Sequence, residues 1–240
     1  MATEVGRYLF AYDEAAGRAT TMLLSEEAST DAVETTLARQ REGGRWAVGF
    51  GRLTEDGRFE LMHKVLLNEK RLVDEVRTGL GRQLPRERFF ARAARAQQQV
   101  RTALDGAHGP YNLLVVPVGA EEGRMTVYAL PAQTNQNAYR LGGDFRFEVN
   151  PAAGEIVSRT PLHEGYYEVG TLPQGTAASA HEAVRPVATD VLFATVRRPK
   201  APHFVKTDRR VYRIAPDGTI TTVPVASFDG RSDVRMLEGM

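Results

Sequence analysis

Short β-rich blocks separated by glycine-containing turns constrain the fold of this chain more than any other feature. In the clearest pair, residues 45–53 and 58–67 flank the turn Thr54–Glu55–Asp56–Gly57. Glycine after aspartate supplies the positive φ of a tight hairpin turn, so this pair predicts two antiparallel strands. Similar pairs recur in the second half, at 111–118 with 124–130 and at 139–149 with 155–160. Consecutive hairpins favour antiparallel pairing.

Further strands are predicted at both ends of the chain. Residues 7–12 and 19–24 are β-rich and flank a turn at 13–17, which indicates an N-terminal hairpin. The C-terminal half adds predicted strands at 190–196, 203–206, 211–214 and 219–225. The intervening segment 170–188 is rich in Gly, Ala, Ser and Pro, which is typical of a long loop.

Three helices are predicted, all in the first half of the chain. Asp31 and Glu34 have the spacing of a capping box, which indicates a short helix ended by Gly43–Gly44. Asn68 is the predicted cap of a second helix that ends at Gly81. The longest helix is predicted over 85–105, because Pro suits a first helical turn and Phe89, Ala93, Ala96, Val100 and Ala103 form one apolar stripe.

Together these elements predict an α+β fold of antiparallel hairpins and meanders, with about three helices mostly in the N-terminal half. The break at Gly106–Pro110 is the best candidate boundary. It divides the chain into a hairpin and helix subdomain, 1–106, and a β-rich subdomain, 107–240. The alternative is one continuous domain with a shared core.

Composition excludes several classes of function. The chain of 240 residues has 31 Lys plus Arg against 30 Asp plus Glu, so bulk charge predicts no polyanion partner. Cysteine is absent, which excludes thiol catalysis, disulfides, thiolate zinc sites and iron–sulfur clusters. No run approaches the roughly 20 apolar residues of a membrane-spanning helix. We therefore expect a cytoplasmic protein without membrane insertion, and no sequence motif predicts a cofactor.

The charge is nevertheless distributed unevenly. Nine basic residues stand against three acidic ones between Lys70 and Arg101, and seven stand against Asp208 alone between Arg197 and Arg213. Such asymmetry can steer an acidic protein surface toward the chain. The predicted partner-binding residues are Arg88, Arg92, Arg95, Arg197, Arg198, Lys200, Lys206, Arg209 and Arg210. The alternative is a solvated face paired internally with the acidic N-terminal segment, and nucleic acid is an unlikely partner.

Histidines are the remaining candidates for catalysis. His163–Glu164 and His181–Glu182 are two His–Glu pairs, and His203 offers a third nitrogen ligand. Such a set can bind zinc or another divalent ion, but neither pair has the His-Glu-x-x-His spacing of a helical metal site. The alternative is that these are exposed polar dipeptides. No serine lies in a Gly-x-Ser-x-Gly elbow, and no phosphate-binding loop is present.

The C-terminal half carries a recognisable pattern. Residues 126–134 (TVYALPAQT) lead into 141–149 (LGGDFRFEV), and the stretch 190–220 adds Pro-His-Phe-Val, Arg-Val-Tyr-Arg-Ile and an Asp-Gly turn. This pattern resembles uncharacterised bacterial proteins with a β-rich C-terminal half. The resemblance covers under half of the chain and implies a fold but no activity and no catalytic residues.

The sequence therefore leaves three functional hypotheses open. The leading one is a non-enzymatic bacterial protein-interaction module, of the accessory or immunity type, that binds a protein partner through its basic surfaces. The second is a metal-assisted hydrolase using His163, Glu164, His181 and His203. The third is a nucleic-acid or small-ligand sensor.

Overall fold

The computed structural model describes residues 2–86, 88–105, 110–117, 123–133, 139–163, 165–169, 177–196, 200–229 and 231–237. These residues form four α-helices and several mainly antiparallel sheets, so the chain has an α+β fold, as predicted. The helices are α1 (Ala2–Ser25), α2 (Phe89–Ala103), α3 (Ala188–Val196) and α4 (Val225–Asp229). No helix among the described residues combines the length and apolar character needed to cross a membrane.

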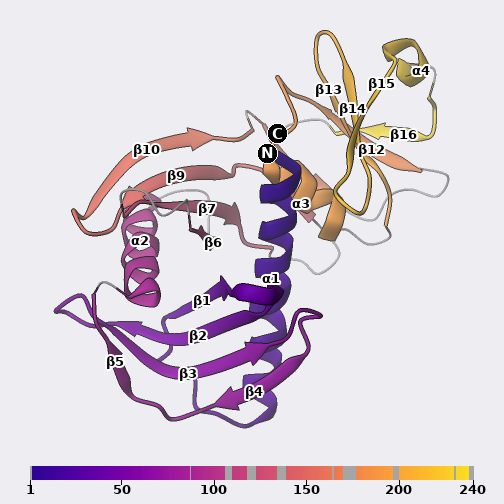
Figure 1. Ribbon diagram of the computed structural model, residues 1–240. Helices are drawn as coiled ribbons and strands as arrows, with labels where there is room; N and C mark the ends of the chain where they lie inside the picture. The colour runs from indigo at the N-terminus through magenta and orange to yellow at the C-terminus, as the bar shows by residue number, and fades with distance from the viewer. Residues whose placement is uncertain are drawn as a thin grey trace.

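The first sheet has the order β1-β2-β3-β4, with β5 also paired to β3 (Figure 1). Its strands are β1 (Thr35–Gln40), β2 (Trp46–Leu53), β3 (Phe59–Leu67), β4 (Val73–Arg77) and β5 (Arg82–Leu84), with the 3-10 turn η1 (Glu42–Gly44) after β1. The predicted hairpin at 45–53 and 58–67 is confirmed as β2 and β3. Gly57 has a φ of +75°, as the turn requires.

Two further groups of strands follow α2. One sheet has the order β10-β9-β7-β6, and β8 pairs separately with β11. These strands are β6 (Tyr111–Val116), β7 (Met125–Pro131), β8 (Tyr139–Gly142), β9 (Phe145–Asn150), β10 (Glu155–Pro161) and β11 (Tyr166–Val169). The predicted pairs at 111–118 with 124–130 and at 139–149 with 155–160 are confirmed as antiparallel pairs, although two glycines divide the segment 139–149 into β8 and β9.

The last sheet has the order β15-β14-β13-β12-β16 and includes parallel pairs on both sides of β12. Its strands are β12 (Ala178–Glu182), β13 (His203–Lys206), β14 (Val211–Ile214), β15 (Ile220–Val223) and β16 (Val234–Met236). The strands predicted at 203–206 and 211–214 are confirmed. The prediction of a loop over 170–188 is wrong for 178–182, while 170–176 lie outside the described residues.

The predicted N-terminal hairpin is wrong, because 2–25 form the single helix α1. Its buried residues include Leu9, Tyr12, Ala15, Ala19 and Leu23, which recur at intervals of three or four. That spacing is helical. The short apolar run at 8–12 imitates a strand, but the alanine-rich segment after it favours a helix.

Three other predictions of secondary structure are wrong, because the burial of these segments in the tertiary structure outweighs their local sequence pattern. Leu37 and Ala38 suggested a narrow helical face, but they lie in β1, whose two faces are covered by different core clusters. The helix predicted after Asn68 is replaced by β4 and β5. The strand predicted at 190–196 is helix α3, nearly all of which is buried. A short run that is apolar on all sides does not distinguish a buried helix from a buried strand.

The long helix is confirmed as α2, although it begins at Phe89 rather than at Pro85. Figure 1 shows α2 between the first sheet and the sheet formed by β6, β7, β9 and β10, and the core around it contains residues of both. A second core lies along α1 and joins the first sheet to Leu114, Tyr128 and Leu192. Both cores cross the predicted boundary near residue 106. The division of the chain into two subdomains stays a prediction.

The crossing of α1 and α3 depends on a glycine. A Cβ atom on Gly6 would lie 2.4 Å from the Cβ of Val191 and 2.7 Å from the carbonyl oxygen of Ala188. Gly17 lies in the same helix and has no such neighbour within 4 Å.

We expect Gly6→Ala to lower the free energy of unfolding by about 1–3 kcal/mol, because the two helices must move apart. Gly17→Ala is the matched control and should raise it by up to about 1 kcal/mol through helix propensity. Urea unfolding measures both. Equal effects of the two substitutions would contradict a close crossing at Gly6.

Candidate metal centre

Strands β12 and β13 bring three polar side chains to one face of the last sheet. The two strands are parallel, with Ser179 paired to His203 and His181 paired to Val205. Side chains alternate across a strand, so Ser179 and His181 share a face while Ala178 and Ala180 pack on the other. The alanines enter an apolar cluster, and Ser179, His181 and His203 are fully buried on the opposite side.

Helix α3 supplies a carboxylate to this face. Asp190 lies in the first turn of the helix, and its Oδ2 accepts a hydrogen bond of 2.8 Å from the backbone N–H of Val187. A carboxylate at a helix N-terminus is stabilised by the unpaired N–H groups there. This bond fixes the carboxylate and leaves Oδ1 directed at the histidines.

His163 approaches the same oxygen from the end of β10. Its Nε2 lies 2.9 Å from Asp190 Oδ1, and its Nδ1 donates a hydrogen bond of 2.6 Å to Asp144 Oδ1. Asp144 follows Gly142 and Gly143, whose φ angles of +88° and +66° turn the chain between β8 and β9. A Cβ on Gly142 would lie 2.0 Å from the carbonyl oxygen of Gly165, so only glycine fits there.

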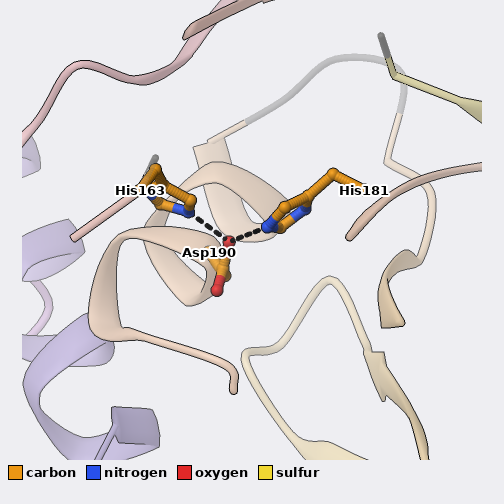
Figure 2. Close-up of side chains that lie close together, drawn as sticks. All are labelled: His163, His181 and Asp190. Atoms are coloured by element: carbon orange, nitrogen blue, oxygen red, sulfur yellow. Dashed lines mark hydrogen bonds and ion pairs between the residues drawn. The ribbon is translucent and has the colours of Figure 1, made fainter. Parts of the chain in front are cut away.

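His181 faces Asp190 from the other side. Its Nε2 lies 3.5 Å from Asp190 Oδ1, but it makes no hydrogen bond with the described residues. Its Nδ1 lies 2.9 Å from His203 Nε2, and His203 Nδ1 lies 2.9 Å from Ser179 Oγ. Figure 2 shows both rings directing a nitrogen at the same oxygen of Asp190.

No protein-family model, curated protein or solved structure matches this chain. The expected resemblance to bacterial proteins with a β-rich C-terminal half therefore stays a prediction.

The three facing atoms fit a divalent metal ion. His163, His181 and Asp190 each offer one ligand atom, and these three atoms lie within 4.8 Å of one another. Zinc bonds of about 2.0–2.1 Å in tetrahedral geometry require ligand atoms about 3.3 Å apart. The 3.5 Å between His181 and Asp190 meets this spacing, and the 2.9 Å between His163 and Asp190 requires only a small opening.

Both histidines are also supported as metal ligands usually are. A ligand histidine commonly donates its second N–H to a carboxylate or another acceptor, which fixes its tautomer and orientation. Asp144 provides this acceptor for His163, and His203 provides it for His181. With Nε2 of His181 on a metal, its Nδ1–H donates to His203 Nε2, and the Nδ1–H of His203 donates to Ser179.

The pKa shifts in the metal-free cluster indicate which proton a bound cation would displace. Burial alone lowers the pKa of His163, but hydrogen bonds to Asp144 and Asp190 outweigh it and raise that pKa to about 10. Burial and the nearby His163 lower the pKa of His181. Burial raises the pKa of Asp190, but the hydrogen bond and charge of His163 give a net lowering. A proton on His163 therefore offsets only part of the charge of the two carboxylates it contacts when no metal is bound.

A cavity of about 650 Å³ adjoins the cluster at His163. Its described walls include Leu162, Tyr167 and Val187, which are largely apolar, and Arg185 and Glu182, which carry charge. His163 lies in the wall of this cavity, although its side chain is only 2% exposed.

The sequence predicted only part of this site. His163, His181 and His203 come together, but His203 supports His181 rather than facing Asp190. Glu164 lies outside the described residues. Asp190 and Asp144 were not predicted as site residues, because they lie on separate elements with no motif spacing between them. A helical reading of 188–196 would have placed Asp190 in a first turn, which is the only local signal for it.

The predicted partner-binding arginines of α2 differ in their surroundings. Arg88 is exposed at the N-cap of α2. Arg95 donates hydrogen bonds to the backbone carbonyls of Pro151, Gly57 and Arg86. Reversing the charge of Arg95 would therefore disturb the fold as well as any interface, so a test of partner binding should change Arg88 and Arg92 alone.

The predicted C-terminal cations are also divided. Lys200 donates to the carbonyl oxygen of Thr195, and Lys206 lies within 4.0 Å of both Glu182 and Asp229. Arg209 and Arg210 are exposed in the turn after β13, and Arg197 and Arg198 lie outside the described residues. The protein-partner hypothesis stays a prediction.

Proposed function

We propose that this chain is a metal-dependent hydrolase whose divalent ion is held by His163, His181 and Asp190. One observation carries the proposal: two imidazole Nε2 atoms converge on a single carboxylate oxygen, while the Nδ1 atom of each ring is held by a buried partner. Convergence of this kind, supported from behind on both sides, is how proteins build metal sites.

The number of ligands favours catalysis over a purely structural role. Structural zinc sites have four protein ligands, whereas catalytic sites have three and keep one position for water or substrate. The described residues supply three, and the cavity reaches the cluster beside His163. A divalent ion in such a site lowers the pKa of a bound water and polarises the bond to be cleaved.

The surrounding residues have distinct roles in this proposal. Asp144 orients His163 and increases its basicity, and His203 with Ser179 orients His181. Leu162, Tyr167 and Val187 exclude water from one side of the cavity, and Arg185 offers a positive charge to an anionic substrate group. A substrate therefore enters beside His163.

The competing explanation is a structural network in which a protonated His163 bridges two aspartates. That explanation leaves the Nε2 atom of His181 buried without a hydrogen bond to the described residues. Burying an imidazole nitrogen without a partner costs free energy. A metal ion removes that cost, and this difference separates the two explanations experimentally.

We expect the chain, purified without chelator, to contain about one zinc or manganese ion, measured by elemental mass spectrometry. His181→Gln should reduce the metal content to background, and circular dichroism of the chelated variant checks that it folds, because His181 is fully buried and contacts His203. His63→Gln is the matched control, because His63 is a buried histidine that contacts Ser29 away from the cluster. Equal metal content in all three proteins, or none in any, would contradict the proposal.

Activity tests the hydrolase part separately. The metal-loaded chain should hydrolyse at least one of a panel of chromogenic carboxylic and phosphate esters, and chelation should abolish that activity. His181→Gln should be inactive and His63→Gln active. Stoichiometric metal binding without hydrolysis of any ester would assign the site a structural role instead.

A further inference from the structure

A second cavity, of about 410 Å³, lies between the first sheet and the start of α2. Its described walls carry five cationic side chains and no carboxylate. The cations are Arg39, Lys64, Arg77, Arg82 and Arg88. We call these five residues the basic pocket.

The fold gathers the basic pocket through a β-bulge. In the pairing of β2 with β3, Phe50 faces His63 and Gly51 faces Leu61, so Met62 is the extra residue. The extra residue shifts the alternation of β3 and brings Lys64 to the same cavity as Leu61. The neighbouring strands complete the arrangement, because Arg77 of β4 pairs with Lys64 and Arg82 of β5 pairs with Leu61.

Few internal partners neutralise these charges. Glu75 pairs with Arg77 at 2.6 Å, and Arg39 lies over the ring of Phe89 at 4.9 Å. Among the described residues, no ion pair or hydrogen bond involves the side chains of Lys64, Arg82 or Arg88. Burial lowers the pKa of Lys64, and so do the nearby charges of Arg41, Arg77 and Arg82, which outweigh the opposite effect of Glu75. The cations therefore repel one another, and an anion would relieve that repulsion.

The remaining walls of the basic pocket suit a small ligand. Helix α2 begins at Phe89 with no acidic residue in its first turn, and the side chain of Arg88 does not cap it. Free N–H groups at a helix start add to the attraction for an anion. Leu61, Leu80 and Phe90 form an apolar floor. Gly49 lets Phe90 lie close to the sheet, because a Cβ there would be 3.2 Å from its ring.

We propose that the basic pocket binds a small molecule carrying at least two phosphate groups. Because Glu75 pairs with Arg77, four cations remain, and one phosphate group with about two negative charges would leave two of them unbalanced, whereas a diphosphate can contact several at once. A cavity of about 410 Å³ has the size of a small-molecule site and not of a macromolecular interface. This inference is independent of the proposed metal centre, which lies on other elements.

Isothermal titration calorimetry on the full chain tests the proposal with pyrophosphate, orthophosphate, ADP and AMP as probes. We expect pyrophosphate to bind at least tenfold more tightly than orthophosphate, and ADP more tightly than AMP. If ADP and pyrophosphate bind equally, the diphosphate alone is recognised. If ADP binds more tightly, the apolar floor contributes to binding a nucleoside. Experiments with excess chelator keep the metal centre out of the comparison.

Two variants locate the site. Arg82→Gln and Arg88→Gln change exposed side chains, so the fold should persist, and each should weaken pyrophosphate binding about tenfold. Arg235→Gln removes an equally exposed arginine from β16 and is the matched control. Absence of pyrophosphate binding at millimolar concentration, or equal weakening by Arg235→Gln, would overturn the proposal.

Discussion

Asp190→Asn is expected to weaken zinc binding by about 10²-fold or more. The binding free energy of zinc sites, on the order of 10–16 kcal/mol over four ligands, corresponds to about 3 kcal/mol for each ligand. Asparagine keeps the shape of the side chain, and its amide oxygen can still accept the N–H of Val187. With the oxygen there, the amide NH2 takes the place of Oδ1, so the substitution removes both the negative charge and the ligand oxygen that the histidines face. A competition titration with a zinc-binding dye measures the change.

The same substitution has a second expected effect, on the metal-free protein. His163 would then pair with Asp144 alone and no charge would be left without a partner, so we expect a loss of about 1–3 kcal/mol from the weakened contact with residue 190. Urea unfolding in chelator measures this cost. If Asp190→Asn fails to fold, His181→Gln tests the same metal site, because it keeps both contacts of His163 and loses only the Nδ1 contact with His203. Zinc affinity unchanged in a folded variant would contradict the ligand assignment.

Asp144→Asn is expected to weaken zinc binding by about 10–100-fold without removing a ligand. Asp144 contacts the Nδ1 of His163, and asparagine can still accept that hydrogen bond through its amide oxygen. The loss of charge makes His163 a weaker base and hence a weaker ligand. The dye competition used for Asp190→Asn measures this effect too.

A matched control for Asp144→Asn is Asp74→Asn, which changes an exposed aspartate near the far end of the first sheet. It should leave zinc affinity unchanged. A variant at Asp144 that binds zinc as tightly as the unmodified chain would show that the carboxylate does not support His163 in the metal-bound state. Equal losses of zinc affinity in both variants would indicate a general effect of the net charge of the chain.

The hairpins were predictable because their turns carry local signals. Gly57 follows Asp56, and a positive φ there needs no tertiary information. Helix α1 and helix α3 were not predicted correctly, since their apolar residues are arranged for contacts with each other and with distant strands. The helical spacing from Leu9 to Leu23 was present in the sequence, but the short run at 8–12 imitated a strand.

The candidate site was predictable only in its residue types. Three of the four predicted metal-site residues, His163, His181 and His203, do meet in the core. Asp190 could not be added from the sequence, because its role depends on the tertiary fold that brings α3 to face His163 and His181. Which histidine faces Asp190 also depends on strand register. The register pairs Ser179 with His203 and so places His203 behind His181.

The most direct test of the metal centre is a crystal structure of the zinc-loaded chain, with data collected on both sides of the zinc absorption edge. Our account predicts one strong anomalous peak about 2.0–2.2 Å from His163 Nε2, His181 Nε2 and an oxygen of Asp190. It also predicts that Asp144 and His203 still contact the Nδ1 atoms of the two histidines. A peak at other residues, or no peak with His163 still bonded to both aspartates, would contradict it.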